Sequence, residues 1–180
     1  MRQVEGLLEG EFDVFMIETQ QDLLETWAYV REGYRVIFEE QEFPINMTLE
    51  NYWKVCSWVV GCNPDKGYGA IFMYKRKGTD EVVGHLVVTD ATERFSDREL
   101  LQMYMVYSHK EEGKRVINLK NHVAVGNWYG KKFGYTTLQS FTPRFSGAIK
   151  RVYVKLAGFE PVALVFHKTI QYNDTDEQTS

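Results

Sequence analysis

Apolar residues recur along this chain with two different periods, and the change of period separates strands from helices. Residues 11–17 alternate in steps of two, which predicts a strand. Two stretches then repeat apolar residues every three to four positions, as the buried face of a helix requires. The first follows the cap-like Thr19 and the second follows Thr48. Their stripes are Leu23, Trp27, Val30, Tyr34 and Ile37 in the first helix, and Leu49, Tyr52, Trp53, Cys56, Val59 and Val60 in the second.

The middle of the chain consists of apolar runs separated by polar loops. Residues 69–74 and 82–89 flank a polar turn that contains Gly78, which predicts a hairpin. A third apolar run covers residues 100–107 after a polar loop over 90–98. We expect these three strands to follow one another as a meander.

The last third of the chain returns to alternating helices and strands. The predicted elements are a helix over 115–132, a strand over 136–141, a short helix over 148–156 and a strand over 161–170. Gly158 caps the short helix, and residues 173–180 form a polar tail. The element order is β-α-α-β-β-β-α-β-α-β. This order predicts one α/β domain over residues 1–172, built on a central mixed, mostly antiparallel sheet.

Composition excludes several classes of protein. Of 180 residues, 44% are hydrophobic and 26% are charged, which is typical of a globular domain. No apolar run reaches the roughly 18–20 residues that a membrane span needs, and the N-terminal residues lack a signal-peptide core. We therefore expect a cytoplasmic protein without a membrane partner. Neither Cys56 and Cys62 nor the histidines have metal-site spacing, so we expect no metal.

Charge is distributed unevenly along the chain. Residues 1–100 carry 10 Lys and Arg against 19 Asp and Glu, whereas residues 101–170 carry 11 against 3. The net charge of −4 conceals this asymmetry. A basic half indicates a polyanionic partner, and both a phosphorylated cofactor and a nucleic acid meet that description. Solvated lysines on exposed helix faces would give the same count.

The apolar run 100–107 leads into a short basic turn and then into helix-like sequence. The turn, residues 108–115, contains Gly113, which lets the backbone come close to a bound group. The first N–H groups of a helix have no intrahelical partner, and the helix dipole adds positive potential there. This arrangement predicts an anion site, such as one for a phosphate. An ordinary strand-to-helix connection would share the pattern.

Two later segments carry a resemblance to a known family. Residues 131–138 place two lysines, one further residue, a glycine and an aromatic residue at a helix end that leads into a strand. Residues 146–162 run from Ser146 through Tyr153 to Gly158 and Phe159. Together with the element order, these segments resemble the GCN5-related N-acetyltransferase (GNAT) family over roughly residues 11–170. The resemblance implies acyl transfer from acetyl-CoA to a primary amine on a small molecule or a protein.

The resemblance also implies which residues bind the cofactor. In the family, the turn after the fourth strand holds the pyrophosphate on its backbone amides. Here it reads Lys110-x-x-Gly113-x-Arg115, with Arg115 in place of a small residue. The implied cofactor-binding residues are Tyr104, Met105 and Val106 for the pantetheine and the acyl carbonyl, Lys110, Gly113, Lys114 and Arg115 at the turn, and Ser146 at the usual asparagine position. One extra residue, Ala157, separates Tyr153 from Gly158.

Two residues are candidates for proton transfer. Tyr153 falls where the family places a tyrosine that donates to the departing thiolate, although a packed helix aromatic fits the pattern too. Glu99, at the start of the strand over 100–107, is a candidate general base acting through water. A solvated glutamate at a strand edge is the alternative. The acidic first hundred residues supply the helices that flank the acceptor site in the family, which fits a cationic acceptor such as a polyamine, an aminoglycoside or a Lys side chain.

Two other functions stay open at this point. One is a non-catalytic assembly module with the same fold, for example in a virus particle, which the altered turn favours. The other is a nucleic-acid-modifying relative that would use the basic half as its footprint. The negative net charge and the scattered aromatics of that half argue against a nucleic-acid partner. A homodimer is also left open.

Overall fold

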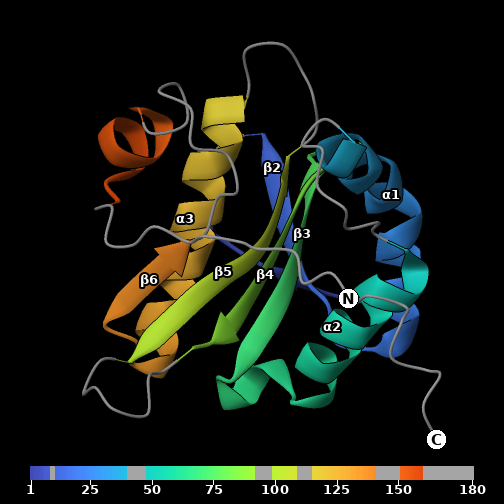
Figure 1. Ribbon diagram of the computed structural model, residues 1–180, viewed down its shortest axis with the longest axis horizontal. Coiled ribbons are helices and arrows are strands. Elements are labelled where there is room, and N and C mark those ends of the chain that lie inside the picture. The colour runs from blue at the N-terminus through green and yellow to red at the C-terminus, as the bar shows by residue number, and fades with distance from the viewer. Residues whose placement is uncertain (9–10, 40–47, 92–98, 109–114, 141–150, 160–180) are drawn as a thin grey trace, which may run out of the picture.

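A six-stranded sheet forms the centre of the protein in the computed structural model, which describes residues 1–8, 11–39, 48–91, 99–108, 115–140 and 151–159. The strands are β1 (Arg2–Val4), β2 (Phe12–Met16), β3 (Gly69–Arg76), β4 (Val82–Asp90), β5 (Leu100–Ser108) and β6 (Thr137–Ser140), side by side in chain order (Figure 1). Neighbouring strands are antiparallel, except that β5 and β6 are parallel. The predicted mixed, mostly antiparallel sheet is therefore confirmed.

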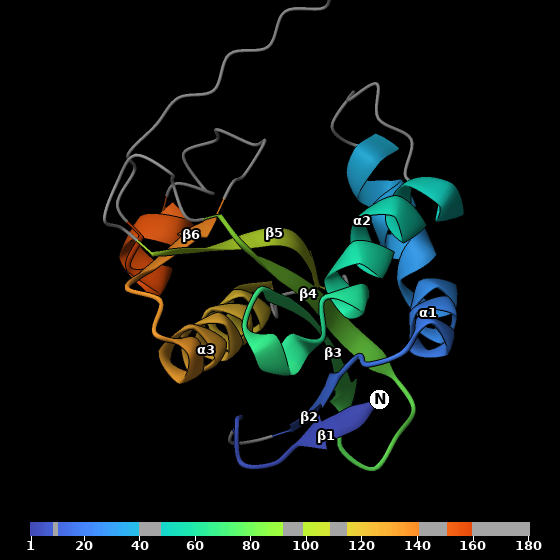
Figure 2. The ribbon, with the colours of Figure 1, turned by 90° about the horizontal axis from the view of Figure 1, so that it is seen from below.

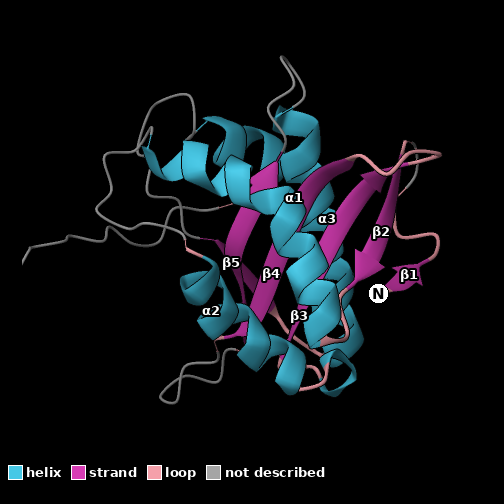
Figure 3. Ribbon diagram, turned by 90° about the vertical axis from the view of Figure 1, so that its right-hand side faces the viewer, coloured by secondary structure: helices cyan, strands magenta, loops and turns pink. Residues whose placement is uncertain are grey.

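Helices α1 (Gln20–Glu39) and α2 (Leu49–Gly61) cover one face of the sheet (Figures 2 and 3). Their starts agree with the predicted caps. The Thr19 hydroxyl accepts a hydrogen bond from the Asp22 N–H at 3.1 Å, and the Asp22 carboxylate accepts one from the Thr19 N–H at 3.0 Å. The Thr48 hydroxyl accepts from the Asn51 N–H at 3.2 Å. Most described stripe residues are buried or half-buried against this face, where Leu23, Val30, Tyr52, Cys56 and Val59 pack with Ile71, Met73 and Val87 of the sheet. Leu49 at the start of α2 is exposed instead, and the side chains of Tyr34 and Ile37 lie outside the described part of the protein.

Helix α3 (Arg115–Phe133) covers the opposite face (Figure 2). It packs Val125 and Tyr129 onto Phe72, Leu86 and Leu101, within a second buried cluster. The sequence contains Gly126 in the middle of this helix because α3 approaches β6 closely there. A Cβ on Gly126 would lie 3.1 Å from both terminal methyl groups of Leu138, which is tighter than ordinary contact.

Tyr129 ties α3 to the turn that precedes β3. Its buried hydroxyl lies 2.8 Å from the carbonyl oxygen of Pro64 and 2.9 Å from that of Gly69, so it can donate to either. Pro64 opens the short 3₁₀ helix η1 (Pro64–Lys66), and the Tyr135 hydroxyl donates to the Gly67 carbonyl at 2.9 Å. These bonds hold the end of α3 and the residues that follow it against η1 and the start of β3.

Several predictions differ from the structure or lie beyond it. Strand β1 was not predicted, since only three residues form it and Arg2 and Gln3 are polar and exposed; it pairs with β2. The short helix predicted over 148–156 is described from Arg151 as η2 (Arg151–Leu156), a π-type helix. The final strand over 161–170 and the tail over 173–180 lie outside the described residues. The single-domain assignment stays a prediction.

Candidate active site

Strand β5 is irregular halfway along its length. Val87 of β4 pairs with Met105, whereas the next residue, Val88, pairs with Met103, so Tyr104 is an extra residue in β5. This is a β-bulge, which bends the strand and removes the extra residue from the regular ladder. The Tyr104 side chain is 52% exposed, while neighbouring Met103 is buried. The bulge therefore presents a large aromatic side chain at the surface, next to the buried Leu101 and Met103 of the same strand.

The described pairing of β5 with β6 ends at the same level. The pairing covers only the first four of the nine residues of β5 and, in the described part of the chain, ends at Met103 and Ser140. Beyond that point no described residue of β6 pairs with β5. An unpaired strand edge can bind an extended chain that carries its own amide groups. The pantetheine arm of CoA is such a chain, so this edge fits the cofactor that the resemblance implies.

The predicted cofactor-binding residues are only partly described. Tyr104, Met105 and Val106 all lie on the stretch of β5 beyond the last β6 pair. Helix α3 begins at Arg115, as the predicted strand–turn–helix order requires. Lys110, Gly113, Lys114 and Ser146 lie outside the described residues, and so does the side chain of Arg115. The binding roles of all eight residues stay predictions.

Tyr153 lies beside Ser140, which is in the last described pair between β5 and β6. It belongs to η2, which contacts α3, and its half-buried ring lies 5.5 Å from that of Phe159. The Ser140 hydroxyl donates to the Tyr153 hydroxyl at 3.5 Å. A π-type helix closes its hydrogen bonds five residues apart rather than four, so it takes in one more residue. The extra Ala157 directly follows η2, and Tyr153 still reaches the end of β6.

Glu99 lies at the other end of this region. Its carbonyl oxygen accepts hydrogen bonds from the N–H groups of Thr136 and Thr137 at 3.1 and 3.2 Å, where β6 begins. A Cβ on Gly134 would lie 3.9 Å from Oε2 of Glu99, so the carboxylate faces the end of α3. Four residues separate Glu99 from Met103, about 13 Å along a strand. The structure thus separates Glu99 from Tyr153, and its role as a base stays a prediction.

Carboxylates gather near Tyr135 at that end of the sheet. Burial, together with the charges of Asp90 and Glu99, raises the pKa of Tyr135 to about 12. The phenol therefore stays protonated and donates to the Gly67 carbonyl. Tyr135 acts as an anchor for the turn before β3, and not as an acid for chemistry at the bulge.

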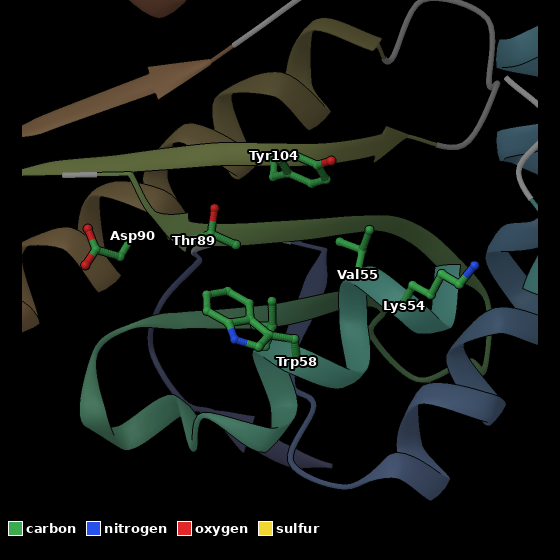
Figure 4. A pocket seen from close by; sticks show the side chains of 7 residues that line it. Lys54, Val55, Trp58, Thr89, Asp90 and Tyr104 are labelled. Atoms are coloured by element: carbon green, nitrogen blue, oxygen red, sulfur yellow. The ribbon is translucent and has the colours of Figure 1, made fainter. Parts of the chain in front are cut away.

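A pocket of about 250 Å³ lies next to Tyr104, on the face that α2 covers. Helix α2 contributes Lys54, Val55, Trp58 and Val59, strand β4 contributes Thr89 and Asp90, and β5 contributes Tyr104 (Figure 4). Trp58 and Tyr104 border the space from opposite elements, and the Thr89 hydroxyl points toward β5. The Asp90 carboxylate lies at one end and points away from Trp58. The pocket and Tyr153 thus lie on either side of the bulge, the pocket on the α2 face and Tyr153 near α3.

Two histidines are buried away from this site. Nε2 of His85 lies 3.3 Å from the Tyr52 hydroxyl, and Nδ1 of His122 lies 3.0 Å from the Tyr74 hydroxyl. Burial, helped by His122, lowers the pKa of His85 to about 3, so this ring is neutral near pH 7. Among the described residues, no three His, Cys, Asp or Glu side chains come together as a metal site. These histidines act as core polar pairs.

The sequence did not identify the pocket. Its one signal was Trp58, an aromatic residue of α2 outside the predicted apolar stripe, which the structure shows to be 55% exposed. An exposed tryptophan next to a buried stripe is a candidate contact for a ligand. Thr89 and Asp90 gave no signal, because they only continue the strand that ends there.

Comparisons with known proteins support the fold. No protein-family model and no curated protein matches the sequence. Solved structures do match: the aminoglycoside acetyltransferase meta-AAC0020 from an uncultured soil metagenomic sample is 15% identical, with 91% of this chain and 99% of that chain covered and a TM-score of 0.62. AAC(6')-Iy, solved with a bisubstrate analogue that contains CoA, is 12% identical, with 90% and 100% covered and a TM-score of 0.63.

A third similar structure is a GNAT family acetyltransferase from Staphylococcus aureus, which is 10% identical, with 89% of this chain and 100% of that chain covered and a TM-score of 0.59. At such low identities the likeness shows the fold and not the substrate. Among the described helices, none is long and apolar enough to cross a membrane.

Proposed function

Because the chain has the fold of the GNAT acetyltransferases, we propose that it transfers an acyl group, most simply acetyl, from CoA to a primary amine. One observation carries the proposal: the bulge at Tyr104, the last described β5–β6 pair and the Tyr153 hydroxyl all lie at one level of the sheet. The fold alone does not identify a function. The proximity of these three features supports a position at which the reacting groups could meet.

The two substrates would reach the bulge at Tyr104 by separate routes. The edge of β5 beyond Met103, with which no described residue of β6 pairs, would hold the pantetheine arm, with Tyr104, Met105 and Val106 offering backbone groups. Helix α3 begins beyond the end of β5, where its N-terminal amides and the turn 108–115 would bind phosphate. The pocket on the α2 face would receive the amine. The acceptor and the thioester would then meet at the bulge from opposite sides.

Acyl transfer from a thioester forms an amide bond as the C–S bond breaks, with one proton leaving the amine and one reaching the sulfur. The Tyr153 hydroxyl accepts a hydrogen bond from Ser140, which leaves its own proton available to donate to a second group. We assign Tyr153 the general-acid role. Glu99 would take up the amine proton along a chain of waters, because it lies about 13 Å along the strand from Met103, which is beyond the reach of a single water.

An activity measurement tests the proposal. Purified protein with acetyl-CoA and a panel of primary amines should release free thiol at a rate that depends on amine and on protein concentration. Thiol release without amine would show hydrolysis only, and no release with any amine would count against an acyltransferase. In that case CoA binding decides whether the fold serves as a non-catalytic module.

A further inference from the structure

We propose that the acceptor is a primary amine on a small, flat, apolar body, such as an arylalkylamine, and that this body lies between Trp58 and Tyr104. The inference rests on the proposed function and narrows its substrate class. It also differs from the expectation drawn from the acidic first hundred residues, which fitted a cationic acceptor such as a polyamine, an aminoglycoside or a Lys side chain. The acceptor is inferred here from the residues that line the pocket, and not from the net charge of residues 1–100.

The two walls of the pocket are aromatic and half exposed. The Trp58 side chain is 55% exposed and that of Tyr104 is 52% exposed, although neighbouring Val59 and Met103 are almost completely buried. Neither ring stacks on another aromatic ring within the described residues. A planar apolar group placed between them would cover ring surface that is now in water. Contacts between aromatic rings also contribute more free energy than the burial of their surface alone.

The base of the pocket is apolar as well. Val55 and Val59 of α2 both line the pocket, and Val55 borders the space beside Trp58 and Tyr104 (Figure 4), so the body of the ligand would contact aliphatic methyl groups there. Drug-sized ligands occupy pockets of about 300–1,000 Å³. The volume of about 250 Å³ therefore fits a small amine better than an oligosaccharide.

The charged residues of the pocket do not suit a polycation. The Lys54 ammonium lies at the rim, bound to Glu50 at 2.8 Å, and would repel additional cationic groups. The Asp90 carboxylate points away from Trp58. An amino sugar carries several ammonium and hydroxyl groups. In this pocket these groups would lose hydrogen bonds to water and contact valine and aromatic side chains instead, which costs free energy.

One polar group lies where the amine of a flat ligand would need it. Thr89 is paired with Gln102, two residues before the bulge residue Tyr104, and its hydroxyl points toward β5. With the body between the rings, the amine can hydrogen-bond to Thr89 and face the bulge. This orientation directs the nitrogen at the point where the acyl group would lie, as reaction between two bound substrates requires.

Matched acceptors test the inference. Phenethylamine, n-butylamine and spermidine are compared by kcat/KM for thiol release with acetyl-CoA, in the wild type, in Trp58→Ala and in Tyr29→Ala. Tyr29 is 49% exposed on α1 and does not line the pocket, so its variant controls for loss of an exposed aromatic residue. Circular dichroism and the Tm establish that each variant is folded.

We expect phenethylamine to exceed both other amines by about tenfold or more, which corresponds to about 1.4 kcal/mol. Trp58→Ala should remove this preference by raising the KM for phenethylamine, whereas Tyr29→Ala should keep the preference. A preference for spermidine, or an unchanged preference in Trp58→Ala, would overturn the inference.

A binding measurement separates failure of this inference from failure of the proposed function. The indole N–H signal of Trp58, assigned by its loss in Trp58→Phe, is followed by NMR while each amine is added to the wild-type protein. A saturable shift with phenethylamine but not with spermidine supports the pocket assignment even if no acyl transfer occurs. No shift with phenethylamine, or an equal shift with spermidine, would refute it whatever the activity.

Discussion

Replacing Tyr153 with Phe removes the proposed acid while leaving its surroundings in place. The ring contact with Phe159 at 5.5 Å is kept, and only the hydrogen bond from Ser140 at 3.5 Å is lost. A half-buried hydrogen bond at that distance contributes at most about 0.5–1.5 kcal/mol to stability. We therefore expect Tyr153→Phe to fold with little change in the free energy of unfolding.

The effect on turnover should be much larger than the effect on stability. A positioned general acid contributes about 10²–10⁴-fold to a rate, or about 3–5 kcal/mol of transition-state stabilisation. The proton is needed only as charge develops on sulfur, so the loss should fall on kcat while the Kd for CoA stays the same. Steady-state thiol release gives kcat, and calorimetry gives Kd.

Ser140→Ala provides the matched control. It removes the same hydrogen bond but leaves the phenol, so its activity should fall far less than that of Tyr153→Phe. Full activity of Tyr153→Phe together with lowered stability would show that Tyr153 is a packing residue and would refute the assignment. Equal loss in both variants would mean that the hydrogen bond, rather than the acid, is what matters.

Three further predictions concern other parts of the molecule. Tyr129→Phe should lower the free energy of unfolding by about 1–3 kcal/mol, because the carbonyl groups of Pro64 and Gly69 lose a buried donor; urea denaturation measures this, and an unchanged midpoint would contradict it. His85 has a folded pKa of about 3, well below its unfolded value, so the unfolded chain binds more protons as the pH falls below about 6.5, and stability should fall by up to about 1.4 kcal/mol per pH unit. Between pH 7 and pH 5 the wild type should therefore lose more stability than His85→Gln, and equal losses would show that His85 does not titrate in this way. Glu99→Gln should lower kcat by about tenfold or less, because a base acting through water over this distance contributes less than a directly placed one; a loss as large as that of Tyr153→Phe would place Glu99 in direct contact with the reaction.

The sequence predicted the layers of the fold because each element buries one face. The stripe from Leu23 to Val30 and the one from Tyr52 to Val59 needed an apolar face to cover, and β3 and β4 supply it with residues such as Ile71 and Val87. The alternating apolar residues of β2 are buried on the opposite face, in the cluster that α3 covers. Helix α3 was predicted despite Gly126, and the close approach of Leu138 explains why that glycine is there. Strand β1 could not be predicted, since three residues are too few to show a period.

The site was harder to predict because its geometry depends on pairing. The run 100–107 is apolar throughout, so nothing in it shows that Tyr104 is a bulge residue; only the register against Val87 and Val88 does. The positions of Glu99 and Tyr153 at opposite ends of β6 likewise follow from strand pairing and not from sequence spacing. The pocket brings α2 against β4 and β5, which are distant in sequence, and it therefore left only the off-stripe Trp58 as a signal.

Binding of CoA tests the central claim most directly, because the proposed donor site, the amine pocket and the role of Tyr153 all require it. Isothermal titration with acetyl-CoA should show saturable binding to one site per chain, and the same ligand should raise the Tm. At a free concentration one hundred times Kd, the ligand should stabilise the fold by about 2.7 kcal/mol. No binding heat and no change in Tm at millimolar acetyl-CoA or CoA would contradict the account and would leave the fold with a non-catalytic role.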